Sequence, residues 1–340
     1  MSEKIVYYHH NKDHFNIGDF LCTPKHYFNF SAGEKLNQKS GGVLILGGGT
    51  YNGSFGAKYL KNFHLPINIG WGLGVTIDRN NPEDLKKSKD SIAAAADLFD
   101  ACSTRDIENA QLNDKLHFVP CVSVMSDIVE LMPGNKTGIF LNADKYRTSV
   151  ETIRHYSNGQ NPGILFSTNA IDELEFRYLF SKTNQIITNS YHVAYWGLLS
   201  GRQVAVAGYS SKFSSLIKLF NLDESKLLRY DKNNLHGLDH HIEEVLNNPH
   251  YYQQVPNHRD YISEFRSINM KYAETLCDRN LVSGFELIEQ NEASLYARTI
   301  EIHGNYDLVK KEVNRTAKKE SSSKHKMSRR IYHRLKRKFF

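Results

Sequence analysis

The side chains best suited to chemistry in this chain are an imidazole, a guanidinium and an ammonium. They belong to His192, Arg105 and Lys212, and each follows an apolar segment by two to four residues. An imidazole exchanges a proton near neutral pH, whereas the two cations can hold a carboxylate or a phosphate. Together these residue types predict proton transfer on an anionic ligand. Two alternatives stay open: a buried structural role for His192, and a surface ion pair between Arg105 and Asp106.

The elements that must position these side chains alternate as strand, turn and helix. We predict strands over 4–8, 42–46, 67–70, 99–103, 117–119, 137–141, 163–167, 186–188 and 203–208, and helices near Phe20 and over 88–99, 107–113, 145–157, 171–180 and 261–276. Such alternation is typical of parallel strands joined by crossover helices. In open sheets of this kind, ligands bind outside the carboxyl ends of the strands, so His192 and Lys212 should share one rim, and Arg105 should lie at the end of its own strand.

The best boundary between domains is the turn Pro133-Gly134-Asn135. We therefore predict an α/β protein with two Rossmann-like, doubly wound domains, over residues 1–133 and 134–306, that face each other across a cleft. Residues 307–340 form a basic tail.

Glycine-rich and polar turns follow other predicted strands. Gly47-Gly48-Gly49 can bring backbone N–H groups to an anion, with Gly48 and Gly49 the candidate contacts. Neither this turn nor Gly70–Gly74 has the spacing of a Walker loop or a dinucleotide fingerprint, and each alone is more often a plain turn. In Asn16-Ile17-Gly18-Asp19, the end residues either cap a helix or face the cleft, where Asp19 would hold a sugar hydroxyl.

Composition restricts the class of protein. At 40% hydrophobic, the 340 residues can form buried cores, but no apolar run approaches the roughly 20 residues of a membrane helix. The first residues do not have the layout of a secretory signal, so we expect a cytoplasmic protein. The four cysteines have no paired spacing, which favours reduced, mostly buried thiols. The 16 histidines show no metal-binding pattern, and we predict no metal.

Positive charge is concentrated at the end of the chain. Residues 318–340 hold ten Lys and Arg and one Glu, so a whole-chain charge of +6 leaves the remainder mildly acidic. Apolar residues recur at spacing four from Met327 to Phe339, with basic residues such as Arg330 and Arg334 between them. On a helix, this pattern suits an anionic membrane surface, and the alternative is a disordered, solubilising tail.

Taken in order, these motifs resemble the polysaccharide pyruvyl transferase family. The matching pieces are Asn16-x-Gly18-Asp19, Gly47-Gly48-Gly49-Thr50, Gly72-x-Gly74, Ser103-x-Arg105-Asp106, Thr188-x-Ser190-x-His192 and Lys212. The resemblance spans roughly residues 4–215. It implies a fold similar to the two-domain GT-B glycosyltransferases and transfer of the pyruvyl unit of phosphoenolpyruvate to a sugar of a bacterial surface polysaccharide, as a cyclic ketal.

The resemblance also implies roles for residues. His192 would be the general acid or base, while Arg105, Lys212 and Ser190 would bind the donor in the second domain. Asn16, Asp19, Gly48 and Gly49 would contact the acceptor or an anion. Phosphoenolpyruvate would serve as co-substrate, with no other cofactor. The acceptor would be a sugar that can be lipid-linked, and the tail would hold the enzyme on the inner face of the plasma membrane.

Two other functions remain open. A GT-B glycosyltransferase that uses a nucleotide sugar would share the fold, but residues 193–196 offer no acid to grip a ribose. A scaffold protein whose tail contacts nucleic acid would bind in a salt-sensitive way. The mildly acidic body argues against that partner, and we expect no nucleic acid.

Overall fold

The computed structural model describes residues 5–9, 15–31, 42–48, 65–74, 82–158, 163–231 and 233–302. One compact unit, Met1–Ser294, contains both large sheets. The other unit, Leu295–Phe340, is described only over 295–302, which are helical. Within these ranges no helix is both long and apolar enough to cross a membrane.

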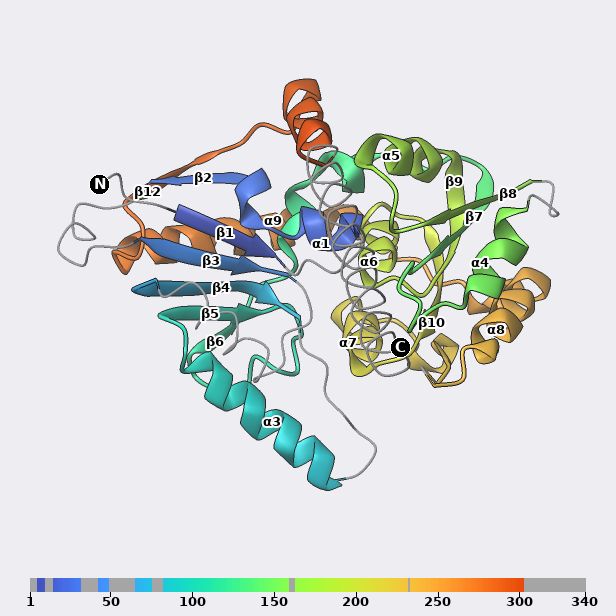
Figure 1. Cartoon of the computed structure of the whole chain (residues 1–340), viewed down its shortest axis with the longest axis horizontal. Helices are drawn as coiled ribbons and strands as arrows, with labels where there is room; N and C mark the ends of the chain where they lie inside the picture. Colours follow the sequence, from blue (N-terminus) through green and yellow to red (C-terminus); the bar gives the residue numbers. More distant parts are fainter. Residues whose placement is uncertain are drawn as a thin grey trace, which may run out of the picture. The chain divides into compact units, whose positions relative to one another are not determined.

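The first large sheet is parallel, with strand order β1-β3-β4-β5-β6 (Figure 1). Its strands are β1 (Ile5–His9), β3 (Val43–Gly47), β4 (Ile67–Leu73), β5 (Ala101–Thr104) and β6 (Leu116–Phe118). Side chains alternate between the faces of a strand. Leu46 and Cys102 therefore pack with α3 (Pro82–Ala96) on one face, while Ile45 and Trp71 belong to a second apolar core.

The second large sheet is also parallel, with order β11-β10-β9-β7-β8 (Figure 1). Its strands are β7 (Lys136–Leu141), β8 (Ile164–Thr168), β9 (Thr183–Thr188), β10 (Gln203–Gly208) and β11 (Leu228–Arg229), joined by α4 (Val150–Ser157), α5 (Glu173–Lys182), α6 (Tyr191–Leu199) and α7 (Ser211–Leu219) and followed by α8 (His236–Asn247). The chain adds β8 on one side of β7 and β9 on the other. The direction of winding thus reverses between β7 and β9, the place where such sheets bind ligands. The prediction of an α/β protein with parallel sheets is confirmed.

The C-terminal segment returns to the apolar core beside the first sheet. Strand β12 (Gly284–Leu287) pairs antiparallel with β2 (Phe28–Ser31), as Figure 1 shows. In α9 (His258–Asp278), Asn269 Oδ1 accepts the indole N–H of Trp71 at 2.8 Å. This long helix therefore covers the core of the first sheet.

Several predicted boundaries differ from the observed ones. The helix near Phe20 is the short α1 (Ile17–Leu21), and Pro24 begins a separate 3-10 helix, because proline lacks the N–H that would continue α1. Residues 107–113 form turns rather than a helix. The helix predicted from residue 145 begins at Val150, where Ser149 Oγ accepts the N–H of Thr152.

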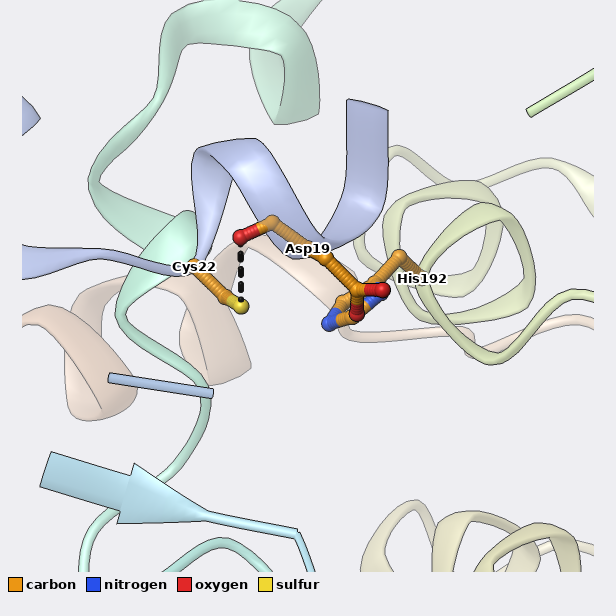
Figure 2. Close-up of side chains that lie close together, drawn as sticks. All are labelled: Asp19, Cys22 and His192. Carbon is orange, nitrogen blue, oxygen red and sulfur yellow. Dashed lines mark hydrogen bonds between the residues drawn. The ribbon is translucent and has the colours of Figure 1, made fainter. Parts of the chain in front are cut away.

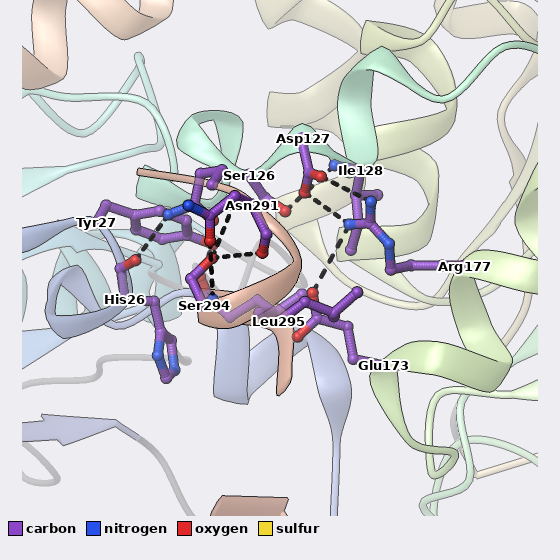
Figure 3. A network of polar contacts seen from close by, with 12 residues as sticks. His26, Tyr27, Ser126, Asp127, Ile128, Glu173, Arg177, Asn291, Ser294 and Leu295 are labelled. Atoms are coloured by element: carbon purple, nitrogen blue, oxygen red, sulfur yellow. Dashed lines mark hydrogen bonds and ion pairs between the residues drawn. The ribbon is translucent and has the colours of Figure 1, made fainter. Parts of the chain in front are cut away.

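Two arginines form hydrogen bonds to the segment between β6 and β7, which joins the two large sheets. Arg177 on α5 forms two hydrogen bonds to Asp127, at 2.6 and 2.7 Å, and lies 3.8 Å from Glu173 (Figure 3). Arg202 is fully buried and donates to the carbonyls of Leu131 and Met132. The chain that leads into β7 is thereby held against the second sheet.

We expect Arg202→Met to destabilise the protein strongly. Arg202 donates at 3.0 to 3.1 Å to four carbonyls, those of Leu131, Met132, Phe180 and Thr183. Buried acceptors left without donors cost about 1–3 kcal/mol each, so the free energy of unfolding should fall by about 3 kcal/mol or more. Urea denaturation measures it, with the exposed Arg154→Met as control. A loss below about 1 kcal/mol would contradict this role.

Candidate active site

His192 lies at the start of α6, directly after the carboxyl end of β9. The ring is only 5% exposed and is 5.9 Å from the ring of Trp196 between centroids. On another side it meets the backbone of Gly18 in α1. The histidine is therefore held between the first turn of its own helix and a helix from the N-terminal half of the chain.

Arg105 reaches His192 from the other sheet. It follows β5, its Nη1 lies 2.9 Å from His192 Nε2, and its guanidinium stacks 4.0 Å from the centroid of the Tyr191 ring. A guanidinium donates hydrogen bonds and cannot accept them. Nε2 is therefore the acceptor in this contact. The contact joins a cation and a proton carrier from the carboxyl ends of the two sheets.

The close approach of Gly18 to His192 gives a test of this arrangement. A Cβ at residue 18 would lie 2.3 Å from His192 Nδ1, so Gly18→Ala must displace the ring. Misplacing a catalytic group by about 1 Å can lower a rate by about 100-fold, and we expect kcat to fall by 10- to 100-fold. Gly284→Ala, where an added Cβ meets nothing within 4 Å, is the matched control. A normal kcat in Gly18→Ala would show that the ring position is not critical.

The polar turn before α1 mainly caps that helix. Asn16 Oδ1 accepts the N–H groups of Gly18 at 2.9 Å and Asp19 at 3.4 Å, and Asn16 Nδ2 donates to Asp19 Oδ2 at 3.0 Å. The cap aims the Asp19 carboxylate toward His192, as Figure 2 shows. Asn16 therefore positions Asp19, whose side chain reaches the site beside the backbone of Gly18.

Backbone conformation and packing account for the glycine at position 48. Its φ is +56°, and an added Cβ would collide with the Cys22 sulfur. Its N–H donates to the carbonyl of Trp71 at 3.3 Å. Gly49 and the tail residues Arg330, Arg334 and Phe339 lie outside the described residues.

Asp19, Cys22 and His192 bring three possible metal ligands within 4.8 Å of one another (Figure 2). The set suits a cation poorly. Burial raises the pKa of the Cys22 thiol well above its usual value, and the thiol donates to the carbonyl of Asp19 at 3.1 Å. A metal ion binds the thiolate and not the thiol. In addition, Arg105 Nη1 already donates a hydrogen bond to His192 Nε2.

Lys212 contacts Tyr209 in the structure. Lys212 Nζ donates to the phenol oxygen of Tyr209 at 2.9 Å, at the start of α7. Ser190 is the N-cap residue of α6, but its side chain makes no cap hydrogen bond, and its N–H donates to Thr188 Oγ1 at 3.0 Å. Of the predicted donor residues, Arg105 is the one placed in contact with His192.

Several residues near the site were not predicted. Cys121 lies near enough to Cys22 and His192 to interact with both, although the spacing of the cysteines gave no sign of it. Tyr191 stacks on Arg105. Arg147 comes six residues after β7, a position that the rule of strand ends could have identified.

Comparisons with known proteins agree with the motif analysis. Residues 3–211 match the family model described as Polysaccharide pyruvyl transferase, which includes every candidate from Asn16 to His192 and ends just before Lys212. A search of curated sequences returns no match. Among solved structures, the chain is similar to sucrose-phosphate synthase from Thermosynechococcus elongatus, with 12% identity, a TM-score of 0.39, and coverage of 69% of this chain and 73% of that one. For a candidate UDP-N-acetylglucosamine 2-epimerase from Listeria monocytogenes, the values are 10%, 0.41, 77% and 77%.

Proposed function

The chain belongs to the polysaccharide pyruvyl transferase family, and from this premise we propose that it moves the pyruvyl group of phosphoenolpyruvate onto a sugar as a ketal. The acceptor is a sugar of a bacterial surface polysaccharide or of its precursor. The observation that carries the proposal is the 2.9 Å contact between Arg105 Nη1 and His192 Nε2. It places a cation for an anionic donor beside a group that can transfer protons.

The reaction needs both groups. Ketal formation makes two C–O bonds at C2 of the enol, breaks the bond from C2 to the phosphate oxygen, and adds a proton to the methylene carbon. The two sugar hydroxyls release two protons, of which one becomes the new methyl hydrogen and the other leaves with the phosphate. A residue that both accepts and donates a proton can serve these steps, and we assign that role to His192.

Arg105 controls access to this residue. Without ligand, its N–H occupies the lone pair of His192 Nε2. An anionic donor competes for the guanidinium, since charge-assisted hydrogen bonds to carboxylate or phosphate are stronger than one to a neutral imidazole. Donor binding then frees Nε2 to accept a proton from a sugar hydroxyl.

The remaining assignments complete the proposal. Ser190 and Lys212 contribute to donor binding at the carboxyl ends of β9 and β10. Asp19, positioned by Asn16, faces the acceptor or an anion, and Gly48 shapes the turn from which Gly49 would contact the same ligand. Phosphoenolpyruvate is the co-substrate, and no other cofactor takes part. The protein works in the cytoplasm, where the basic tail holds it on anionic membrane beside a lipid-linked acceptor.

Thermal unfolding of the full chain with phosphoenolpyruvate, beside a panel of nucleotide sugars, tests the donor. A ligand that binds only the native state stabilises it by about 2.7 kcal/mol at a hundredfold excess over Kd. Stabilisation by phosphoenolpyruvate supports the proposal. Stabilisation by a nucleotide sugar alone overturns it in favour of a glycosyltransferase.

A further inference from the structure

The ring of Tyr209 contacts two cationic side chains at the carboxyl edge of the second sheet. The ring centroid lies 4.7 Å from Lys212 Nζ and 4.9 Å from Arg147 Cζ, so the two charges are within 10 Å of each other. Lys212 comes from the start of α7 and Arg147 from the loop between β7 and α4. The ring thus joins the ends of two strands that lie on either side of β9.

The phenol group adds a third donor. Its oxygen accepts a hydrogen bond from Lys212 Nζ at 2.9 Å and another from Asn142 Nδ2 at 3.3 Å. A phenol oxygen has two lone pairs and one hydrogen. With both lone pairs engaged, the hydrogen is left to donate, and no acceptor for it occurs among the described residues.

The loop that carries Arg147 is held firmly in place. The carbonyl of Arg147 accepts hydrogen bonds from Tyr230 Oη at 2.7 Å and from Asn189 Nδ2 at 3.2 Å. Asn189 is fully buried, and its Oδ1 accepts the N–H of Asn142 at 2.7 Å. The positions of the donors are therefore set by the ends of β7, β9 and β11 before any ligand arrives, as in a preorganised site.

Among the described residues, Arg147 and Lys212 donate hydrogen bonds to neutral groups, the carbonyl of Tyr146 and the phenol of Tyr209. In the part of the chain that the structure describes, neither Arg147 nor Lys212 forms an ion pair with a carboxylate. The acid of the same loop, Asp144, is buried and accepts the N–H of Tyr146 at 3.0 Å. Two like charges held together without a counter-ion favour an anionic ligand.

We propose that Arg147, Tyr209 and Lys212 form a phosphoryl-binding site, in which Arg147 is a substrate-binding residue. The Arg147 fork and the Lys212 ammonium match the oxygens of a phosphate or diphosphate, and the phenol donates a further hydrogen bond. Which phosphoryl group it holds rests on the proposed function: the phosphate of the donor, or the diphosphate of a lipid-linked acceptor. The site itself needs only an anion with several oxygens.

Calorimetric binding of inorganic pyrophosphate to the full chain tests the site. We expect Arg147→Ala and Lys212→Met each to weaken binding by about 10- to 100-fold, because each loses charge-assisted hydrogen bonds. Arg154→Ala, an exposed arginine on α4, is the matched control and should bind as the wild type does. Lys212→Met leaves the Arg147 loop intact, so it serves if Arg147→Ala fails to fold. Affinities within about twofold of the wild type in both variants would overturn the proposal.

Phosphoenolpyruvate binding distinguishes the two sources. If the donor phosphate occupies the site, Arg147→Ala weakens phosphoenolpyruvate binding as well. If the site holds the diphosphate of an acceptor, Arg147→Ala leaves that affinity unchanged while pyrophosphate binding is lost. A wild-type protein that binds pyrophosphate through Arg147 but never binds phosphoenolpyruvate would sustain the site and overturn the proposed function.

Discussion

Replacing His192 by glutamine is expected to lower kcat by about 10²- to 10⁴-fold, the range for losing a general acid–base group. The glutamine carbonyl can still accept the hydrogen bond from Arg105, but an amide cannot transfer a proton. Binding of phosphoenolpyruvate should therefore persist while turnover is lost. Initial rates of phosphate release in the presence of a sugar acceptor measure the effect.

A second histidine provides the control for this prediction. His155 lies on α4 with its side chain 53% exposed, so His155→Gln should leave both kcat and KM unchanged. If His192→Gln lowered kcat by less than about tenfold, another group must carry the proton, and His192 would be a positioning residue. If KM for the donor rose with kcat unaltered, the imidazole would serve in binding alone.

The parallel sheets could be predicted because their signals are local. The apolar run Val43–Gly47 is buried at every residue, and turn residues mark where it ends. The pairing of β2 with β12 could not be predicted in this way, since its partners, such as Phe30 and Phe285, are far apart in the sequence. The same holds for α9, whose amphipathic pattern predicts a helix but does not say that it packs on Trp71.

The ends of the strands predict which residues belong to the site but not which of them contact one another. Arg105, His192 and Lys212 were predicted because each follows a strand. The structure shows that Arg105 contacts His192, whereas Lys212 contacts Tyr209. Which of these residues contact one another depends on their side-chain rotamers and on how the two sheets pack. The order of motifs in the sequence specifies neither. Arg147 was overlooked because the helix predicted over 145–157 placed it inside a helix, whereas the observed helix begins only at Val150.

Replacing Arg105 by alanine should have the largest effect on donor binding. Removing one partner of a buried, hydrogen-bonded charge pair costs about 2–5 kcal/mol, so affinity for phosphoenolpyruvate should fall by about 30- to 5,000-fold. Arg105 is only 3% exposed and stacks on Tyr191, so little water is available to replace it. The thermal stabilisation by phosphoenolpyruvate should disappear in this variant.

Comparison with Arg105→Lys separates charge from geometry. Lysine keeps the positive charge but loses the planar fork that grips an anion with two hydrogen bonds and stacks on the Tyr191 ring. We expect it to recover only part of the lost affinity, and urea denaturation confirms that each variant folds. If Arg105→Ala bound phosphoenolpyruvate as tightly as the wild type, the donor anion would lie elsewhere, and the 2.9 Å contact with His192 would be structural. If lysine restored full affinity, a point charge would suffice and the guanidinium fork would have no part in recognition.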